Sequence, residues 1–144
     1  MKKIVLISCA AKKDKRKRKA KDLYLSDLFK KNLAYGRSLN PDKIFILSAK
    51  YNLLELDREI EPYDLTLNNF KKDELKQWTS KTIEQLSKES DLQNDIFIIL
   101  AGAKYRKYLE VHLKNKEIPM KGLPIGKQLQ FLTKMLDGNN IRLA

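Results

Sequence analysis

The sequence predicts a small α/β domain with a mainly parallel sheet. Three short apolar runs, at residues 3–8, 43–49 and 95–101, show no alternation of polar and apolar residues, which is typical of strands buried on both faces. Segments with helical periodicity lie between these runs, and strands that alternate with helices favour parallel pairing through right-handed crossovers. We expect a two-layer or three-layer domain with at least three strands and about four helices.

Each helix is predicted from apolar residues three or four positions apart. The first begins at an Asp22 cap and ends before Pro41, because the residue before a proline avoids the helical region. The second begins near Asn69, with acidic residues in its first turn that suit the positive end of the helix dipole. The third spans about residues 103–114, and the fourth follows Pro124.

The chain is strongly basic, and its charge is concentrated. It has 144 residues, which suits a single domain over residues 1–144, and a formal net charge of +12. More than half of that charge lies in residues 12–21, KKDKRKRKAK, called here the basic run. Because each cation that neutralises a phosphate releases a counterion, this loop is a candidate nucleic-acid contact. The alternative is a solvated surface loop in a lysine-rich chain. The expected phosphate contacts are Lys12, Lys15, Arg16, Lys17, Arg18, Lys19 and Lys21.

The sequence offers no residue set for a disulfide, a metal or a bound cofactor. Cys9 is the only cysteine and His112 the only histidine, which are too few ligands for a zinc site. His112 is expected beside core positions of the third helix rather than as a general base. No apolar run approaches the ~18 residues of a membrane span. We therefore expect a cytoplasmic protein with no metal, cofactor or membrane partner.

Small and polar residues follow each predicted strand, at the edge where parallel sheets bind ligands. The first strand ends at Ser8, the second at Ser48 with Tyr51 soon after, and the third just before Gly102. Because the carboxyl ends of parallel strands meet at one edge, we expect these four residues to contact a substrate. The alternative is that small residues only ease the turns into helices.

Three residues near these strand ends are candidates for chemistry. Cys9 would gain thiolate character beside the basic run, although a lone cysteine at a strand end is more often a packing residue. Lys13 and Lys50 can bind an anion or, when desolvated, act as nucleophiles. Lys50 is the more isolated candidate, because Lys13 lies within the basic run.

Residues 52–69, called here the acidic segment, form a long connection with five Asp or Glu residues against Arg58. Loops of this length are commonly functional or disordered, and the apolar residues of this one argue against disorder. Pro62 and Tyr63 would hold Asp64 in place, which makes Asp64 a candidate acid and Tyr63 a candidate substrate contact. An ordered acidic segment facing the basic run would close over a ligand. The alternative is a surface loop that packs on itself.

Five motifs follow one another along the chain. They are Ser8-Cys9 with Lys12 and Lys13, Asp22-Leu23-Tyr24-Leu25-Ser26-Asp27-Leu28-Phe29, Ile46-Leu47-Ser48-Ala49-Lys50-Tyr51, Pro62-Tyr63-Asp64, and Gly122-Leu123-Pro124-Ile125-Gly126-Lys127-Gln128-Leu129. In order and spacing they resemble a family of short, uncharacterised bacterial and phage proteins. That family is distantly similar to the peroxide-stress YaaA proteins, which bind DNA. It is also similar to the core domain of archaeosine synthase, which modifies a deazaguanine base in transfer RNA with a lysine nucleophile. The second similarity implies that Cys9, Lys13, Tyr24 and Ser26 belong to the site.

The leading hypothesis is a nucleic-acid-associated protein that acts on a base or nucleotide at the carboxyl ends of the strands. Tyr24 and Ser26 would bind substrate at the start of the first helix, whose N-terminus suits a phosphate. Two alternatives stay open. One is an enzyme acting on a free nucleotide or another phosphorylated small molecule, and the other is a binding module without catalysis.

Overall fold

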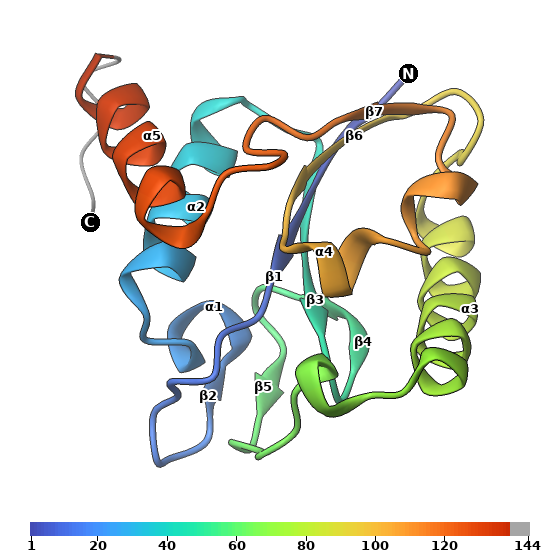
Figure 1. The fold of residues 1–144 in the computed structure, drawn as a ribbon, viewed down its shortest axis with the longest axis horizontal. Coiled ribbons are helices and arrows are strands. Elements are labelled where there is room, and N and C mark those ends of the chain that lie inside the picture. The colour runs from blue at the N-terminus through green and yellow to red at the C-terminus, as the bar shows by residue number, and fades with distance from the viewer. Residues whose placement is uncertain (139–144) are drawn as a thin grey trace.

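A mainly parallel sheet forms the middle layer of the domain (Figure 1). The computed structural model describes residues 1–138, and within them the main sheet has five strands in the order β4-β3-β1-β6-β7. The strands are β1 (Lys3–Ser8), β3 (Lys43–Ser48), β4 (Asn52–Glu55), β6 (Ile96–Leu100) and β7 (Asn115–Glu117). β4 alone runs antiparallel to its neighbour in this sheet. The predicted fold class is therefore confirmed.

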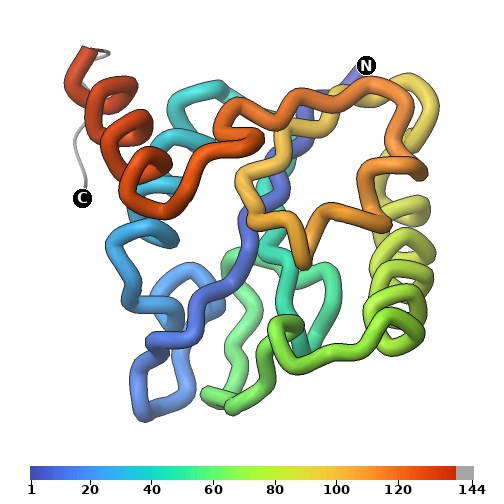
Figure 2. Tube along the Cα trace, in the orientation of Figure 1, coloured from blue at the N-terminus to red at the C-terminus, as the bar shows by residue number. Residues whose placement is uncertain are grey.

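Helices cover both faces of the sheet, which makes the domain three-layered (Figures 1 and 2). α2 (Asp27–Ser38) and α5 (Ile125–Gly138) lie on one face, and α3 (Lys72–Glu89) lies on the other. Val5 and Ile7 of β1 point into the core beneath α2, whereas Ile4 and Leu6 point into the core beneath α3. Burial on both sides is why the strand sequence is an unbroken apolar run.

The first predicted helix is interrupted. α1 (Ala20–Leu23) stops at Tyr24, and α2 begins at Asp27, so the cap of the long helix is Ser26 and not Asp22. The Ser26 hydroxyl accepts a hydrogen bond from the Phe29 N–H at 3.1 Å. The break has a tertiary cause, because Tyr24 takes an extended conformation and forms an antiparallel bridge with Lys13.

The third predicted helix is also interrupted. α4 (Ala103–Arg106) and the 3-10 turn η2 (Glu110–His112) replace one continuous helix. Leu109 and Leu113 are buried as the spacing predicted, but His112 is exposed. The two short helical turns bury these leucines, and β7 begins three residues after the end of η2.

The basic run and the acidic segment meet beyond the carboxyl ends of the main sheet (Figure 2). β2 (Arg18–Lys19) pairs antiparallel with β5 (Glu59–Ile60), and the acidic segment ends in the 3-10 turn η1 (Leu67–Asn69). Lys21 donates its N–H to the Leu56 carbonyl at 2.9 Å, and its Nζ lies 3.1 Å from Asp57 Oδ1. The acidic segment is thus ordered against the basic run, and the end of that run is a strand and a helical turn rather than an unpaired loop.

Within residues 1–138, no helix combines the length and the apolar character needed to cross a membrane.

Candidate functional site

A chain of hydroxyl groups lies at the carboxyl ends of β1 and β3. Tyr63 Oη is 2.6 Å from Tyr24 Oη and 2.8 Å from Ser48 Oγ. Ser48 Oγ also accepts the N–H of Tyr51 at 3.0 Å. The Tyr24 and Tyr63 rings meet edge to face, with centroids 6.4 Å apart. The acidic segment therefore places a tyrosine directly on the sheet edge.

A thiol joins this edge from the end of β1. Cys9 Sγ lies 3.1 Å from Tyr105 Oη of α4. The Tyr105 ring stands edge-on to Trp78 at 5.8 Å between centroids, and Trp78 Nε1 donates to the Ser48 carbonyl at 2.9 Å. Ser48 is therefore a common neighbour of the hydroxyl chain and of the aromatic pair that holds the thiol.

Lys13 brings a positive charge to the same place. Its Nζ lies 4.4 Å from the centroid of the Tyr63 ring and 5.9 Å from that of Tyr24, within cation–π range of both. Burial lowers the pKa of Lys13, while the charges of Cys9 and Asp64 oppose that shift. A lowered pKa gives this amine a larger neutral fraction than a fully solvated lysine has.

We call six residues the site cluster: Cys9, Lys13, Tyr24, Ser48, Tyr63 and Tyr105. Burial raises the pKa of Tyr24, of Tyr63 and of Tyr105. The three phenols are therefore neutral at physiological pH and can both donate and accept hydrogen bonds. The cluster thus combines an amine, a thiol and neutral hydroxyls, which are groups suited to binding and activating a polar substrate.

A groove of about 1000 Å³ runs beside the site cluster, between the basic run and α2. Tyr24 forms part of its lining. Its cations are Arg18, Lys21, Lys30, Lys31 and Arg37, and its carboxylates are Asp14, Asp22 and Asp27. The N–H of Arg16 lowers the pKa of Asp14, and so does the pairing of Asp14 with Arg18 at 2.9 Å. The groove therefore offers cations to an anionic ligand right up to the cluster.

The model of one protein family matches residues 4–134, which cover all of the main sheet except Lys3 and reach into α5. The chain belongs to the family of unknown function DUF6884. Neither the curated proteins nor the solved structures contain a match. What can be said about the function of this DUF6884 protein therefore rests on its residues and their geometry.

The structure gathers five of the residues singled out from the DUF6884 sequence. Cys9, Lys13, Tyr24, Ser48 and Tyr63 all belong to the site cluster. Asp64 is exposed and close enough to Lys13 to influence the charge of its amine. Tyr51 borders the cluster, since its ring lies edge-on to that of Tyr63 at 5.8 Å.

The other predicted site residues lie apart from these contacts. Lys50 is exposed and reaches over the Tyr51 ring at 5.4 Å, on the outer side of the cluster. Ser8 ends β1, beside Leu47 of β3, and the Ser26 hydroxyl is used in capping α2. Gly102 caps α4 and lines a separate small pocket. The cations from Lys15 to Lys19 are all exposed, and Arg18 among them lines the groove.

Sequence reasoning missed Tyr105 and Trp78 as site residues. Both lie on helical patterns, where the spacing predicts core positions. One signal was present for Tyr105, because it comes a few residues after β6 and so lies at the same sheet edge as Cys9. No pattern in the sequence marks the contact of Trp78 with the Ser48 carbonyl.

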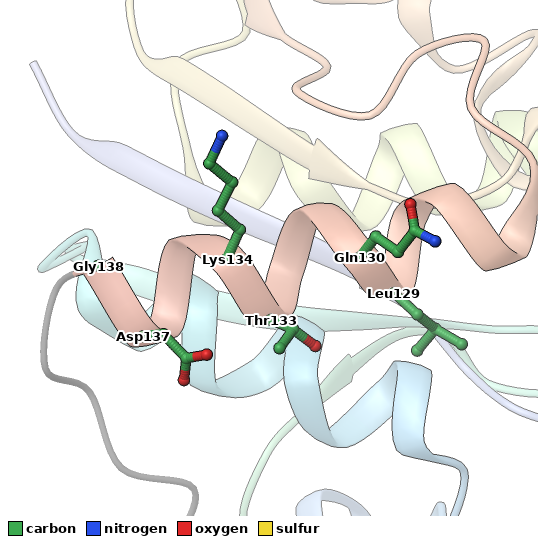
Figure 3. Close-up of a pocket in the computed structure, with 6 residues that line it drawn as sticks. All are labelled: Leu129, Gln130, Thr133, Lys134, Asp137 and Gly138. Atoms are coloured by element: carbon green, nitrogen blue, oxygen red, sulfur yellow. The ribbon is translucent and has the colours of Figure 1, made fainter.

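Another hollow lies far from this edge, on α5 (Figure 3). It has a volume of about 760 Å³ and is lined by Leu129, Gln130, Thr133, Lys134, Asp137 and Gly138. Figure 3 shows Thr133 turned toward α2, where its hydroxyl lies 2.8 Å from Lys31 Nζ. One helix supplies the whole described lining, so this hollow is a surface depression and brings no second element to a ligand. Over residues 1–138, no three His, Cys, Asp or Glu side chains gather in a way that could hold a metal ion.

Proposed function

We propose that this DUF6884 protein binds a nucleic acid through its basic run and acts on a base or nucleotide at the site cluster. One observation carries the proposal: a single segment, residues 9–24, supplies both parts. Cys9 and Lys13 stand at its start, consecutive cations from Lys15 to Lys19 follow, and Tyr24 closes it. When the cations bind the phosphates of a nucleic-acid strand, the next nucleotide of that strand would lie at the site cluster.

The electrostatic part of the proposal follows from how polyanions bind. Each Lys or Arg that neutralises a phosphate releases condensed counterions, so affinity falls steeply as salt rises. The acidic segment braces the inner side of the basic run through Lys21 and Asp57, and the cations at the tip of the run stay exposed. This arrangement favours contact with phosphates on the outer side of the loop and along the groove.

The chemical part rests on the partly desolvated Lys13 amine. Its lowered pKa suits it to act as a base or nucleophile, with Asp64 as a nearby acid and Tyr63 and Tyr24 as hydrogen-bonding groups. The spacing of Cys9, Lys13 and Tyr24 also resembles the core domain of archaeosine synthase, which supports a base as the target. Lys50, on the outer side of the cluster, is assigned to a phosphate of the bound nucleotide. A cytoplasmic setting fits a single free thiol.

The test is a salt titration with fluorescently labelled single-stranded DNA and RNA. The variant K15Q/R16Q/K17Q/K19Q removes four cations of the basic run. Its matched control, K72Q/K76Q/K81Q/K88Q, removes four exposed cations of α3 on the opposite face. We expect the first variant to bind more weakly and with a smaller salt slope, by about 0.7 for each phosphate that is no longer neutralised. The control should bind as the wild type does.

The proposal fails if the wild type shows no affinity for either polymer at low salt, or if both variants lose affinity equally. Free nucleotides that raise the melting temperature without any polymer binding would instead favour an enzyme of small molecules. Polymer binding that is unaffected by K13A, with no change in the polymer after incubation, would favour a binding module without catalysis.

A further inference from the structure

A pocket of about 200 Å³ lies at the carboxyl end of β6, beside α4. We propose that this pocket holds one nucleobase of the bound nucleic acid and that Gly102 keeps it open. The inference rests on the proposed function and deepens it, because it names the part of the substrate that is recognised and where it is seated.

Gly102 is a glycine that the fold itself does not require. Its φ of −68° and ψ of 167° are extended and open to any residue, and a Cβ built there would meet nothing within 4 Å. By contrast, a Cβ at Gly36 would lie 3.0 Å from Val5 Cγ1, and Gly122 has a φ of +81°. Gly102 lines the pocket and is exposed, so a large side chain at this position would stand at the pocket wall without a clash in the fold.

The walls of the pocket suit a flat apolar face. Ile99, Ala101, Met120 and Leu123 contribute to them. Nucleobases taken out of a stack are held between apolar and aromatic side chains, and methionine adapts its shape to such a ring. The volume is below the range of about 300–1,000 Å³ typical of sites for drug-sized ligands, so the pocket accepts a single ring system.

The charge of the lining favours an uncharged ligand. Arg106 is the charged residue among the described lining, and its Nη1 lies 2.7 Å from Glu110 Oε2. Both side chains are largely buried, at 14% and 16% exposure, and Arg106 Nε donates to the Ala101 carbonyl at 3.2 Å. Because Glu110 already neutralises the guanidinium, a phosphate or carboxylate gains little there, whereas a planar neutral ring can stack on it.

Gln128 supplies a group that can read the edge of a base. Its Nε2 donates to the Leu123 carbonyl at 2.7 Å, which fixes the amide and leaves Oε1 to accept a hydrogen bond. An exocyclic amino group is the base donor that fits this acceptor. The pocket and the site cluster share one element, since Gly102 caps the short helix that carries Tyr105, and Tyr105 Oη lies 3.1 Å from Cys9 Sγ.

The test compares a labelled single-stranded oligonucleotide with an abasic strand of the same length, at one salt concentration. G102L places a large side chain at the wall of the pocket, and G126L is the matched control, because a Cβ at Gly126 also meets nothing within 4 Å. We expect the wild type and G126L to prefer the base-containing strand by at least tenfold. G102L should bind both strands as the wild type binds the abasic one, with an unchanged salt slope. Urea unfolding of both variants shows that they are folded.

The outcomes separate the two proposals. If G102L keeps the tenfold preference, or if the wild type never has it, the pocket assignment is wrong while salt-dependent binding still supports the proposed function. If the wild type binds neither strand but binds free adenosine or cytidine in calorimetry, and G102L does not, the pocket is a nucleobase site and the polymer is the wrong substrate. If the wild type binds neither strand and no nucleoside, both proposals fall.

Discussion

Tyr63 Oη lies 2.6 Å from Tyr24 Oη, a contact between residues 39 positions apart that fastens the acidic segment to the end of α1. The same hydroxyl lies 2.8 Å from Ser48 Oγ, so Tyr63 bridges both loops to the end of β3. These two hydroxyl contacts make the site cluster part of the folded core and not a set of surface side chains.

Tyr63→Phe should lower the free energy of unfolding by about 1–3 kcal/mol, because it leaves the buried hydroxyls of Tyr24 and Ser48 short of a partner. Urea denaturation measures the change. Tyr108→Phe, on a tyrosine outside the cluster, is the control and should change stability by less than about 0.5 kcal/mol. Equal effects from both substitutions would contradict a structural role for the bridge.

Substitution of alanine for glycine should change the stability of the fold in opposite directions at two helical positions, Gly36 and Gly126. Gly36→Ala should lower stability by about 1 kcal/mol, because a Cβ 3.0 Å from Val5 Cγ1 overpacks a fully buried strand by more than alanine gains in helix propensity. Gly126→Ala adds a Cβ in open space and should raise stability by up to about 1 kcal/mol. Thermal unfolding of the two variants, recorded side by side, decides the signs.

Lys13 should react with amine-directed reagents at a lower pH than a lysine in an unstructured reference peptide does. Reaction rate follows the neutral amine, and burial lowers the pKa of Lys13, so its rate should reach half its maximum at lower pH. Mass spectrometry of labelled peptides across a pH series measures both midpoints. Because the Asp64 charge opposes the shift, Asp64→Asn should move the Lys13 midpoint lower still, whereas Glu61→Gln should leave it in place. A Lys13 midpoint equal to that of the reference peptide would refute the effect of burial.

Cations of α2 should contribute to polymer binding, if the groove carries the phosphate backbone. The double variant K30Q/R37Q should reduce the salt slope by about 0.7 for each phosphate that it leaves without a cation, in addition to the effect of the basic run. K81Q/K88Q on the opposite face is its control. Binding by K30Q/R37Q that matches this control at every salt concentration would confine the phosphate contacts to the basic run.

Asp95 should stabilise the fold in a pH-dependent way. Its carboxylate accepts the N–H of Lys2 at 2.7 Å and that of Asp91 at 2.8 Å, and these bonds lower the pKa of Asp95 from its ordinary value of 3.8. A carboxyl pKa that is lower in the folded than in the unfolded state adds stability above about pH 3.8, and that stability is lost as pH falls through the folded value.

Asp95→Ala should therefore cost about 1–3 kcal/mol at pH 7, and the difference from the wild type should shrink in acid. Urea unfolding at a series of pH values measures both effects. Glu61→Ala, on an exposed carboxylate of the acidic segment, is the control and should have little effect at any pH. A pH-independent cost at Asp95 would mean that the side chain acts through packing and not through its charge.

Strands and helices that bury their side chains were predictable, whereas those defined by backbone pairing were not. β1, β3 and β6 have unbroken apolar sequences, because both of their faces are covered. β7 is Asn-Lys-Glu, fully exposed in its side chains, and is a strand only because its backbone pairs with β6. The break at Tyr24 has the same origin, since its pairing with Lys13 joins residues that no helical periodicity connects.

By itself, the sequence determined the α/β class with a mainly parallel sheet, the strand ends that would meet at one edge, and the place where positive charge gathers, whereas the number of layers came from the structure. The three properties that the sequence determined depend on local patterns of apolar and charged residues. Only the tertiary structure decided which side chains share the site: it brought Tyr63 and Tyr105 from distant segments to Ser48 and Cys9, left Lys50 on the outer side, and opened a pocket at Gly102. The physical reason is that hydrogen bonds and ring contacts between remote segments depend on how the layers pack. The spacing of residues along the chain does not predict that packing.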